Sequence, residues 1–174
     1  MKGNDMAFDR KKLQTLKWLR KIATTTPSGM KSAYNPYSGD IFVRFGLFYA
    51  TNGYMVARVS WDENMHDGDD TWLTVKRFED EKGHLLETLE YAPYERYNLK
   101  NYEFEKFFPS PSDGCKHDHF HMPNPALVTL AMRGFALNDL YPTYQMTDTQ
   151  VLYAAHNRDI ELRVSCMLAI ENKR

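Results

Sequence analysis

The stretch that decides the fold is residues 41–61, IFVRFGLFYATNGYMVARVSW. Apolar residues occupy every second position on both sides of Asn52-Gly53, namely Ile41, Val43, Phe45, Leu47 and Tyr49 before it and Met55, Ala57, Val59 and Trp61 after it. A period of two is typical of strands with one buried face. Asn and Gly tolerate the positive φ that a tight two-residue turn needs. The stretch therefore predicts a β-hairpin that turns at Asn52-Gly53.

Composition predicts one globular domain over residues 1–174, with residues 1–7 as a tail. The chain has 174 residues, 43% hydrophobic and 26% charged, which is enough for one sizeable core. The net charge of −1 means that any attraction to nucleic acid must come from a local patch. The two cysteines form no disulfide framework, and the sequence contains no secretory signal or membrane-length apolar run. These features predict a cytoplasmic protein that does not bind membranes.

Two amphipathic helices are predicted. Residues 9–23 place an apolar stripe at helical spacing, with Trp18 off the stripe or at its edge; the stripe is Leu13, Leu16, Leu19, Ile22 and Ala23. A second helix begins after Asn124, a favoured cap, with Pro125 at the first helical position. Its apolar side is Ala126, Leu127, Leu130, Ala131 and Phe135.

Further strands are predicted at residues 72–78, 84–90, 119–122, 143–147, 150–156 and 160–170. Extended connections separate them at residues 62–70 and 91–118. The second connection mixes aromatic and basic residues, a pattern found in single-strand binding sites, but its glutamates dilute the positive charge and favour a role in covering a core. This order of elements predicts an α+β fold in which two helices pack on an antiparallel sheet.

The polar side of the first helix is strongly basic. It carries Lys11, Lys12, Lys17, Arg20 and Lys21, with almost no acid. Such a cluster is most often a solvated surface. It can also face phosphates, because a local basic patch attracts nucleic acid even in a near-neutral chain.

Residues 115–121 contain a candidate metal site. His117, His119 and His121 would share one face of a strand, and Cys115 would extend that face. Imidazole and thiolate groups are ligands for zinc. The alternative is that these histidines form the polar end of a strand and bind no metal. Because the chain contains no nucleophile elbow, P-loop or dinucleotide fingerprint, we expect a non-catalytic protein without a cofactor.

Several segments in order resemble one domain of the bacterial sliding clamp, the beta subunit of DNA polymerase III. ATNGYMVA at residues 50–57 is similar to the clamp pattern Ala-Thr-Asp-Gly-x-x-x-Ala, and FEKFFP at residues 104–109 is similar to the segment before the second clamp helix. Residues 124–132 resemble that helix, and residues 148–170 resemble the closing strands. The resemblance implies a DNA-clamp-like domain.

By this resemblance, the protein is a non-catalytic scaffold for duplex DNA or replication proteins. The DNA-facing helices of clamps imply contacts from Lys11, Lys12, Lys17, Arg20, Lys21 and Arg133. The chain departs from the family because it has room for one domain rather than three. It also has Met167-Leu168-Ala169-Ile170 where clamps carry a Met-Pro pattern. A phage or mobile-element relative fits these departures.

Two alternatives remain open on the sequence. One is a clamp-fold interaction module that assembles through unpaired sheet edges without DNA. The other is a metal-binding protein or hydrolase centred on His117, His119 and His121.

Overall fold

The computed structural model describes residues 10–26, 40–61, 71–93, 104–110 and 123–168. The elements in chain order are α1 (Arg10–Thr24), β1 (Ile41–Arg44), β2 (Leu47–Thr51), β3 (Met55–Trp61), β4 (Thr71–Glu79), β5 (Leu85–Pro93), η2 (Phe104–Phe107), α2 (Pro125–Leu137), β6 (Thr143–Met146), β7 (Gln150–His156) and β8 (Ile160–Met167). The expected fold class, α+β with two helices on an antiparallel sheet, is confirmed.

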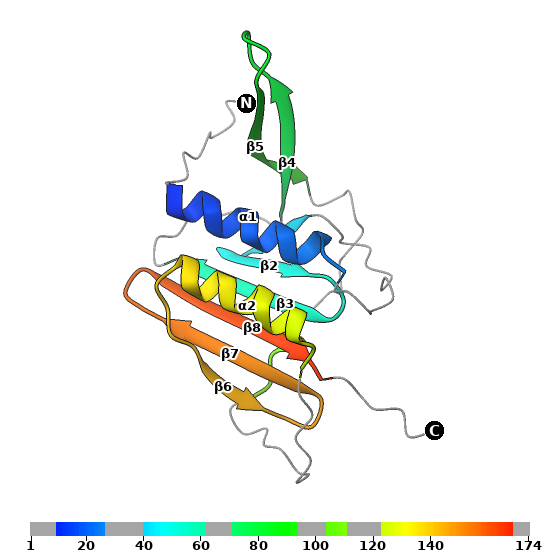
Figure 1. Cartoon of the computed structure of the whole chain (residues 1–174), viewed down its shortest axis with the longest axis vertical. Coiled ribbons are helices and arrows are strands. Elements are labelled where there is room, and N and C mark those ends of the chain that lie inside the picture. Colours follow the sequence, from blue (N-terminus) through cyan, green and yellow to red (C-terminus); the bar gives the residue numbers. More distant parts are fainter. Residues whose placement is uncertain (1–9, 27–39, 62–70, 94–103, 111–122, 169–174) are drawn as a thin grey trace.

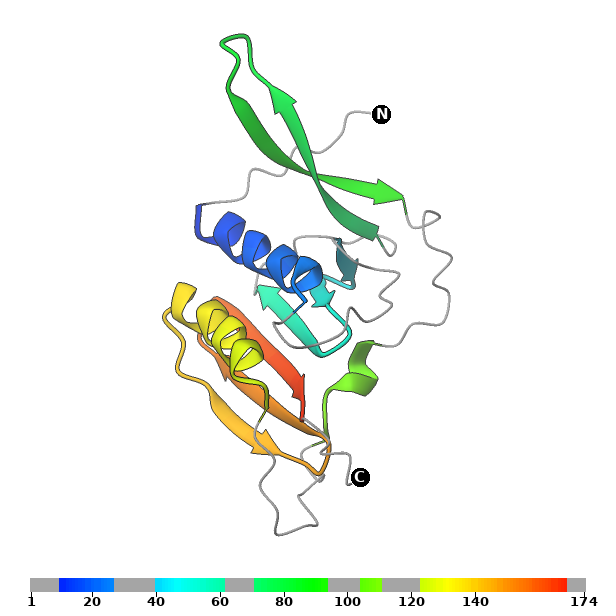
Figure 2. The same cartoon turned by 45° about the vertical axis from the view of Figure 1, so that its right-hand side comes forward.

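The described strands form one sheet in the order β5-β4-β1-β2-β3-β8-β7-β6, and every neighbouring pair is antiparallel. Helices α1 and α2 lie side by side on one face, which we call the helix face (Figure 1). The single-turn helix η2 lies on the opposite face, the far face (Figure 2). The β4–β5 hairpin projects beyond the layer of helices (Figure 1).

The central part of the sheet is built from two similar halves. Each half is a helix followed by three antiparallel strands, α1-β1-β2-β3 and α2-β6-β7-β8. Their last strands, β3 and β8, pair at the centre, where Arg58 is opposite Arg163. The order β1-β2-β3-β8-β7-β6 is therefore unchanged when the halves are exchanged, as expected for an approximate twofold axis through this pair.

The main core fills the space between the helices and the sheet. It includes buried side chains from both helices and from alternate positions of the central strands, among them Leu16, Leu19, Ile22, Ala57, Val59, Leu127, Phe135, Leu162 and Val164. Alternate strand residues point to opposite faces, so the apolar periodicity of β3 and β8 places these residues under the helices. The strand predicted at residues 160–170 is confirmed through Met167.

The two helices also meet each other directly through Trp18. This residue, expected off the apolar stripe of its helix or at the edge of that stripe, is part of the core. Its ring is only 4% exposed, and its indole Nε1 donates to the Leu130 carbonyl at 2.8 Å. The ring packs against Gly134, which has no side chain to obstruct it. Ala126, expected on the apolar side of α2, is exposed.

The expected long strand before Asn52-Gly53 is wrong, because a second turn divides it. Phe45 and Gly46 have φ values of 50° and 73°, and Arg44 pairs with Leu47 across them. This two-residue turn shifts the alternation, so Val43 faces the helices whereas Tyr49 faces the far side. Phe45 itself is 85% exposed.

The Asn52-Gly53 hairpin exists, but its central residues are Gly53 and Tyr54. The Asn52 amide donates to the Met55 carbonyl at 3.3 Å, and of these residues only Gly53 has a positive φ, 85°. Asn52 is buried and holds the turn through its side chain. Its Oδ1 accepts from the amides of Tyr54 and Met55, and its Nδ2 donates to the Thr25 carbonyl after α1. Asn52 thus links the hairpin to α1.

The Phe45-Gly46 turn suggests a stabilising substitution. A bulky residue with positive φ is strained, whereas Asn adopts this conformation readily at the first position of such turns. Phe45→Asn is expected to raise the free energy of unfolding by about 0.5–1 kcal/mol in denaturant titrations. Phe45→Leu is the control, because it keeps the strain and should bring no gain. If both substitutions raise the free energy of unfolding equally, the cause is removal of the exposed aromatic ring and not relief of strain.

The other predicted elements have mixed outcomes. The hairpin expected at residues 72–90 is confirmed as β4 and β5, and β6 and β7 match their predicted strands closely. The connection expected at residues 91–118 is partly wrong, since Tyr91–Pro93 end β5 and residues 104–107 form η2. The predicted connection at residues 62–70 and the strand at 119–122 lie outside the described residues.

Candidate functional site

The basic side of α1 is the first candidate site. Arg10, Lys11, Lys17 and Lys21 are exposed, and Lys12 and Arg20 are half-buried. The first turn holds three of these cations and no acid. Cations at a helix N-terminus oppose the helix dipole by about 0.3–1 kcal/mol each. Helix stability therefore does not explain this arrangement.

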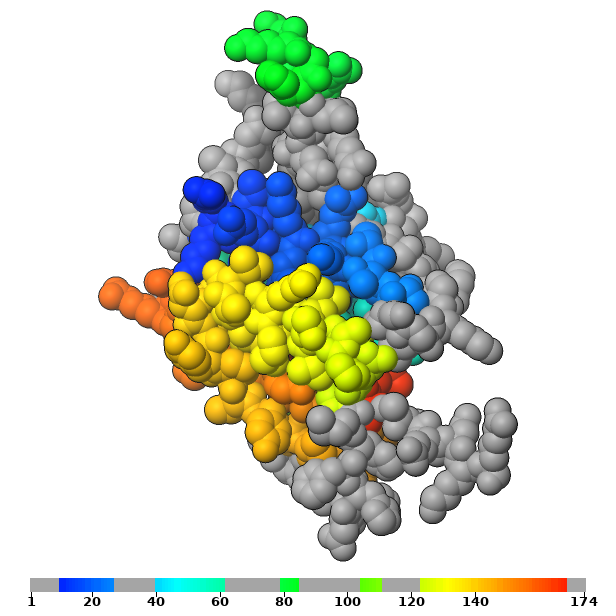
Figure 3. Space-filling model, in the orientation of Figure 1, coloured from blue at the N-terminus to red at the C-terminus, as the bar shows by residue number. Residues whose placement is uncertain are grey.

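Helix α2 extends the same surface, since both helices lie together on the outside of the molecule (Figure 3). Arg133 is exposed there, and neither helix contains an Asp or Glu. One acid beside this surface is Asp139, which follows α2 and accepts from Lys11 Nζ at 2.9 Å. The structure thus places the six predicted DNA-contacting residues on two adjacent helices.

The far face carries a second site, built by the segment around η2. The Phe104 ring stacks against both Phe42 and Tyr49, with centroid distances of 5.0 and 4.9 Å, and the rings of Phe42 and Tyr49 lie 6.3 Å from each other. Phe108 is also buried, and the Arg58 guanidinium lies 5.6 Å from the centre of its ring. Of the aromatic residues in the 91–118 connection that the structure describes, Phe104 and Phe108 therefore cover a small core, whereas Phe107 is exposed.

Arg58 is the centre of an ion network on this face. Its Nη1 lies 2.9 and 3.0 Å from the two Glu105 carboxylate oxygens, and its Nη2 donates to Glu161. Arg163, opposite Arg58 on β8, contacts the same Glu161 oxygen at 2.8 Å. Two cations directly opposite each other repel. The carboxylates of Glu105 and Glu161 balance them.

The network also sets the protonation of its members. Burial and the hydrogen bond to Glu105 raise the pKa of Tyr49, whose hydroxyl donates to Glu105 at 2.5 Å. Burial would raise the pKa of Glu105, but the bonds from Tyr49 and Arg58 outweigh it and lower that pKa. Glu105 is therefore charged and Tyr49 neutral at pH 7. A neutral Tyr49 is a donor here rather than a phenolate nucleophile.

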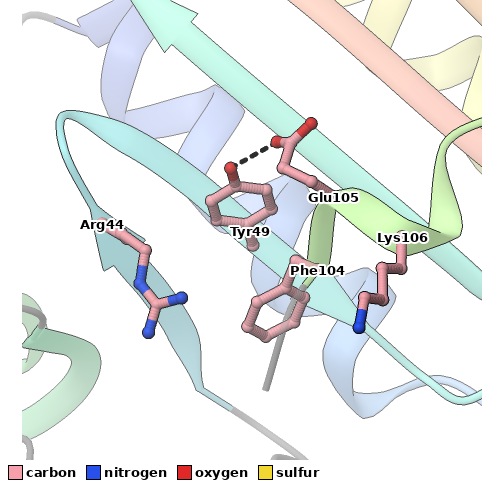
Figure 4. Close-up of a pocket in the computed structure, with 5 residues that line it drawn as sticks. All are labelled: Arg44, Tyr49, Phe104, Glu105 and Lys106. Carbon is pink, nitrogen blue, oxygen red and sulfur yellow. Dashed lines mark hydrogen bonds between the residues drawn. The ribbon is translucent and has the colours of Figure 1, made fainter. Parts of the chain in front are cut away.

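A hollow of about 170 Å³ lies beside this network, between β1, β2 and η2. Figure 4 shows Arg44 and Lys106 on either side of the Phe104 ring, with Tyr49 turned toward Glu105. Arg44 lies over the Phe42 ring at 5.0 Å. The aromatic rings that line this hollow therefore already pack against other side chains of the protein.

A second hollow, of about 70 Å³, opens at the turn between β2 and β3. We call it the β2–β3 hollow; its lining is Thr51, Gly53, Tyr54, Met55, Val56, Phe107, Gln150, Ser165 and Met167. The turn residues come from the stretch that carries the clamp resemblance. Met167 and Phe107 are 49% and 42% exposed, so they present apolar surface to solvent at this site. Exposed Met and aromatic side chains are common in protein-binding surfaces.

The predicted metal ligands His117, His119 and His121, with Cys115, lie outside the described residues. Within the part of the chain that the structure describes, no three His, Cys, Asp or Glu side chains are grouped to hold a metal. Cys166 is buried on the helix face, and burial raises the pKa of its thiol, which makes it unreactive. No helix among the described residues has the length and apolarity to cross a membrane.

Sequence reasoning missed the ion network. Arg58, Glu161 and Arg163 lie at polar positions of alternating strands. This pattern predicts which face of the sheet each side chain is on, but not which side chain it contacts.

Comparisons with protein-family models, curated proteins and solved structures found no match to this chain.

Proposed function

We propose that this protein is a non-catalytic, clamp-like scaffold that contacts duplex DNA through the basic side of α1. The observation that carries the proposal is the charge of the two helices. They hold Arg10, Lys11, Lys12, Lys17, Arg20, Lys21 and Arg133 and no acid, although the whole chain has a net charge of −1. Phosphate contacts come mainly from such cations and need no specific bases.

The architecture supports the clamp-like part of this proposal. Two helix-and-three-strand halves are joined through β3 and β8, with both helices on one surface. The resemblance at residues 50–57 coincides with the β2–β3 turn, and the resemblance at residues 104–109 coincides with η2. A ring around DNA would need several copies of a chain of this size.

Charge reversal on α1 tests DNA binding. Lys17 and Lys21 are both exposed, so changing them to Glu should leave the fold intact. In fluorescence anisotropy with a labelled duplex of about 20 base pairs, Lys17→Glu/Lys21→Glu is expected to weaken binding at least about ten-fold. The slope of log affinity against log salt should fall by about two, one for each lost phosphate contact.

The matched control reverses two exposed cations elsewhere, Lys82→Glu/Arg158→Glu, with the same change in total charge. Lys82 lies in the β4–β5 loop and Arg158 between β7 and β8. The control should bind DNA far better than the α1 variant. If both variants lose the same affinity, or if the original protein binds no DNA at low salt, α1 is not a DNA-binding surface. A separate measurement, light scattering with and without the duplex, would report whether several chains assemble on DNA.

A second candidate is a protein interaction module that does not bind DNA. Its supporting observation is apolar surface away from α1, at the β2–β3 hollow and beside β6. In the described sheet β6 pairs only with β7, and Tyr141 and Tyr144 near it are 93% and 72% exposed. Self-association that is lost on Tyr144→Lys, without any effect of DNA, would favour this candidate.

A further inference from the structure

Residues 104–110 form a strap across the far face that is separate from the main core. Phe104 and Phe108 belong to a second apolar cluster with Phe42, Tyr49 and Leu152. The main core under the helices contains no residue of the strap. The two clusters lie on opposite faces of the sheet and have no buried residue in common.

Polar bonds attach the strap near both of its ends. At its start, Glu105 accepts hydrogen bonds from Tyr49 on β2 and Arg58 on β3. At its end, the Ser110 carbonyl accepts from Gln145 Nε2 on β6 at 2.8 Å. Charge-assisted bonds are about twice as strong as neutral ones. Glu105 is therefore a stronger attachment than the bond from Gln145 to Ser110.

The strap also builds the β2–β3 hollow. Phe107 is one of the lining residues, whereas Tyr54 and Met167 come from the β2–β3 turn and from β8. Glu105 and Phe107 lie in the same turn of η2, in which the Phe108 amide bonds to the Glu105 carbonyl at 3.1 Å. The position of Phe107 at the hollow thus depends on where Glu105 is held.

We propose that Glu105 is a clasp that positions the strap, and that the strap leaves the far face as one unit without unfolding of the main core. With the strap docked, the β2–β3 hollow is complete. With the strap released, the hollow loses its Phe107 wall and the apolar side chains of Phe42, Tyr49 and Leu152 are uncovered. Glu105 acts here as a positioning residue. The clasp and the release of the strap do not depend on the proposed function. Only the identity of a partner that would enter the hollow rests on it.

Hydrogen exchange followed by mass spectrometry tests the clasp. Glu105→Gln keeps the shape of the side chain but removes its charge. A peptide covering residues 104–110 should exchange about ten-fold faster in this variant, while a peptide from β8 should be unchanged. Glu81→Gln, at an exposed position in the β4–β5 loop, is the matched control and should alter neither peptide. Equal acceleration of both peptides, or none, would overturn the proposal.

Methyl NMR of methionine gives a readout at the hollow itself. Met55 and Met167 both line the hollow, and Met132 packs against the main core. Because Phe107 and Met167 line the same hollow, the Met167 signal should shift in Glu105→Gln as the Phe107 ring moves, and the Met132 signal should not move. Tyr49→Phe, which removes only the hydroxyl, should cause a smaller shift in the same direction and add little to Glu105→Gln. A Met167 signal that ignores Glu105→Gln would contradict the positioning role.

These experiments use the isolated protein and contain neither DNA nor a partner. A failure of the DNA-binding tests would therefore leave the clasp unaffected, and a failure of the clasp would leave the DNA-binding proposal unaffected.

Discussion

Gly134→Ala is expected to lower the free energy of unfolding by about 2 kcal/mol. A Cβ at this position would lie 2.3 Å from the Trp18 ring, far inside van der Waals contact. The ring cannot easily move, because it is buried and its Nε1 is bonded to the Leu130 carbonyl. Overpacking of this kind costs about 1–3 kcal/mol or more, and the better helix propensity of Ala recovers only about 1 kcal/mol. Urea titration would measure the change.

The double variant Trp18→Leu/Gly134→Ala identifies the cause. If the clash with the indole is responsible, Gly134→Ala should cost little or nothing once Trp18 is replaced, so the two effects should not be additive. Ala136→Gly, at an exposed position of the same helix, controls for propensity and should cost about 1 kcal/mol. Full additivity would mean that the cost of Gly134→Ala does not come from the indole, and would contradict the close packing of Trp18 on Gly134.

Arg58→Met is expected to destabilise the protein by about 2–3 kcal/mol. The Arg58 side chain is 11% exposed and bonds to both Glu105 and Glu161. Removal of one partner from a buried ion pair costs about 3–5 kcal/mol, since the other charge is left behind. Here the loss should be smaller, because the side chains of Glu105 and Glu161 are 53% and 38% exposed and water can solvate them. Denaturant titration at pH 7 would measure it.

Arg163→Met is the matched control for this prediction. Arg163 is the register partner of Arg58 and contacts the same Glu161, but its side chain is 39% exposed and its ion pair is with one carboxylate. Its loss should cost less than about 1 kcal/mol, as for surface ion pairs. If Arg163→Met costs as much as Arg58→Met, the contribution of the network comes from its total charge and not from the buried position of Arg58.

Several features of this protein follow from local sequence alone. Asn124 and Pro125 specify the start of α2, and the Asn124 side chain does accept from the Ala126 amide at 2.9 Å. The alternation of Ile160, Leu162 and Val164 specifies the buried face of β8. Cap chemistry and a two-residue period act between neighbours in the chain, so they can be read without knowledge of the fold. The basic side of α1 is visible for the same reason.

Other features were decided only by tertiary structure. Phe45 has a positive φ that its own preference opposes, and the turn forms because β1 and β2 pair on either side of it. Trp18 is buried because Gly134, far away in the chain, leaves space for its ring. Arg58 meets Glu105 and Glu161 across separations of 47 and 103 residues, which only the pairing of β3 with β8 and the docking of η2 bring together. Sequence spacing has no information on such contacts, because side chains distant in the chain acquire neighbours only when the sheet and the strap assemble.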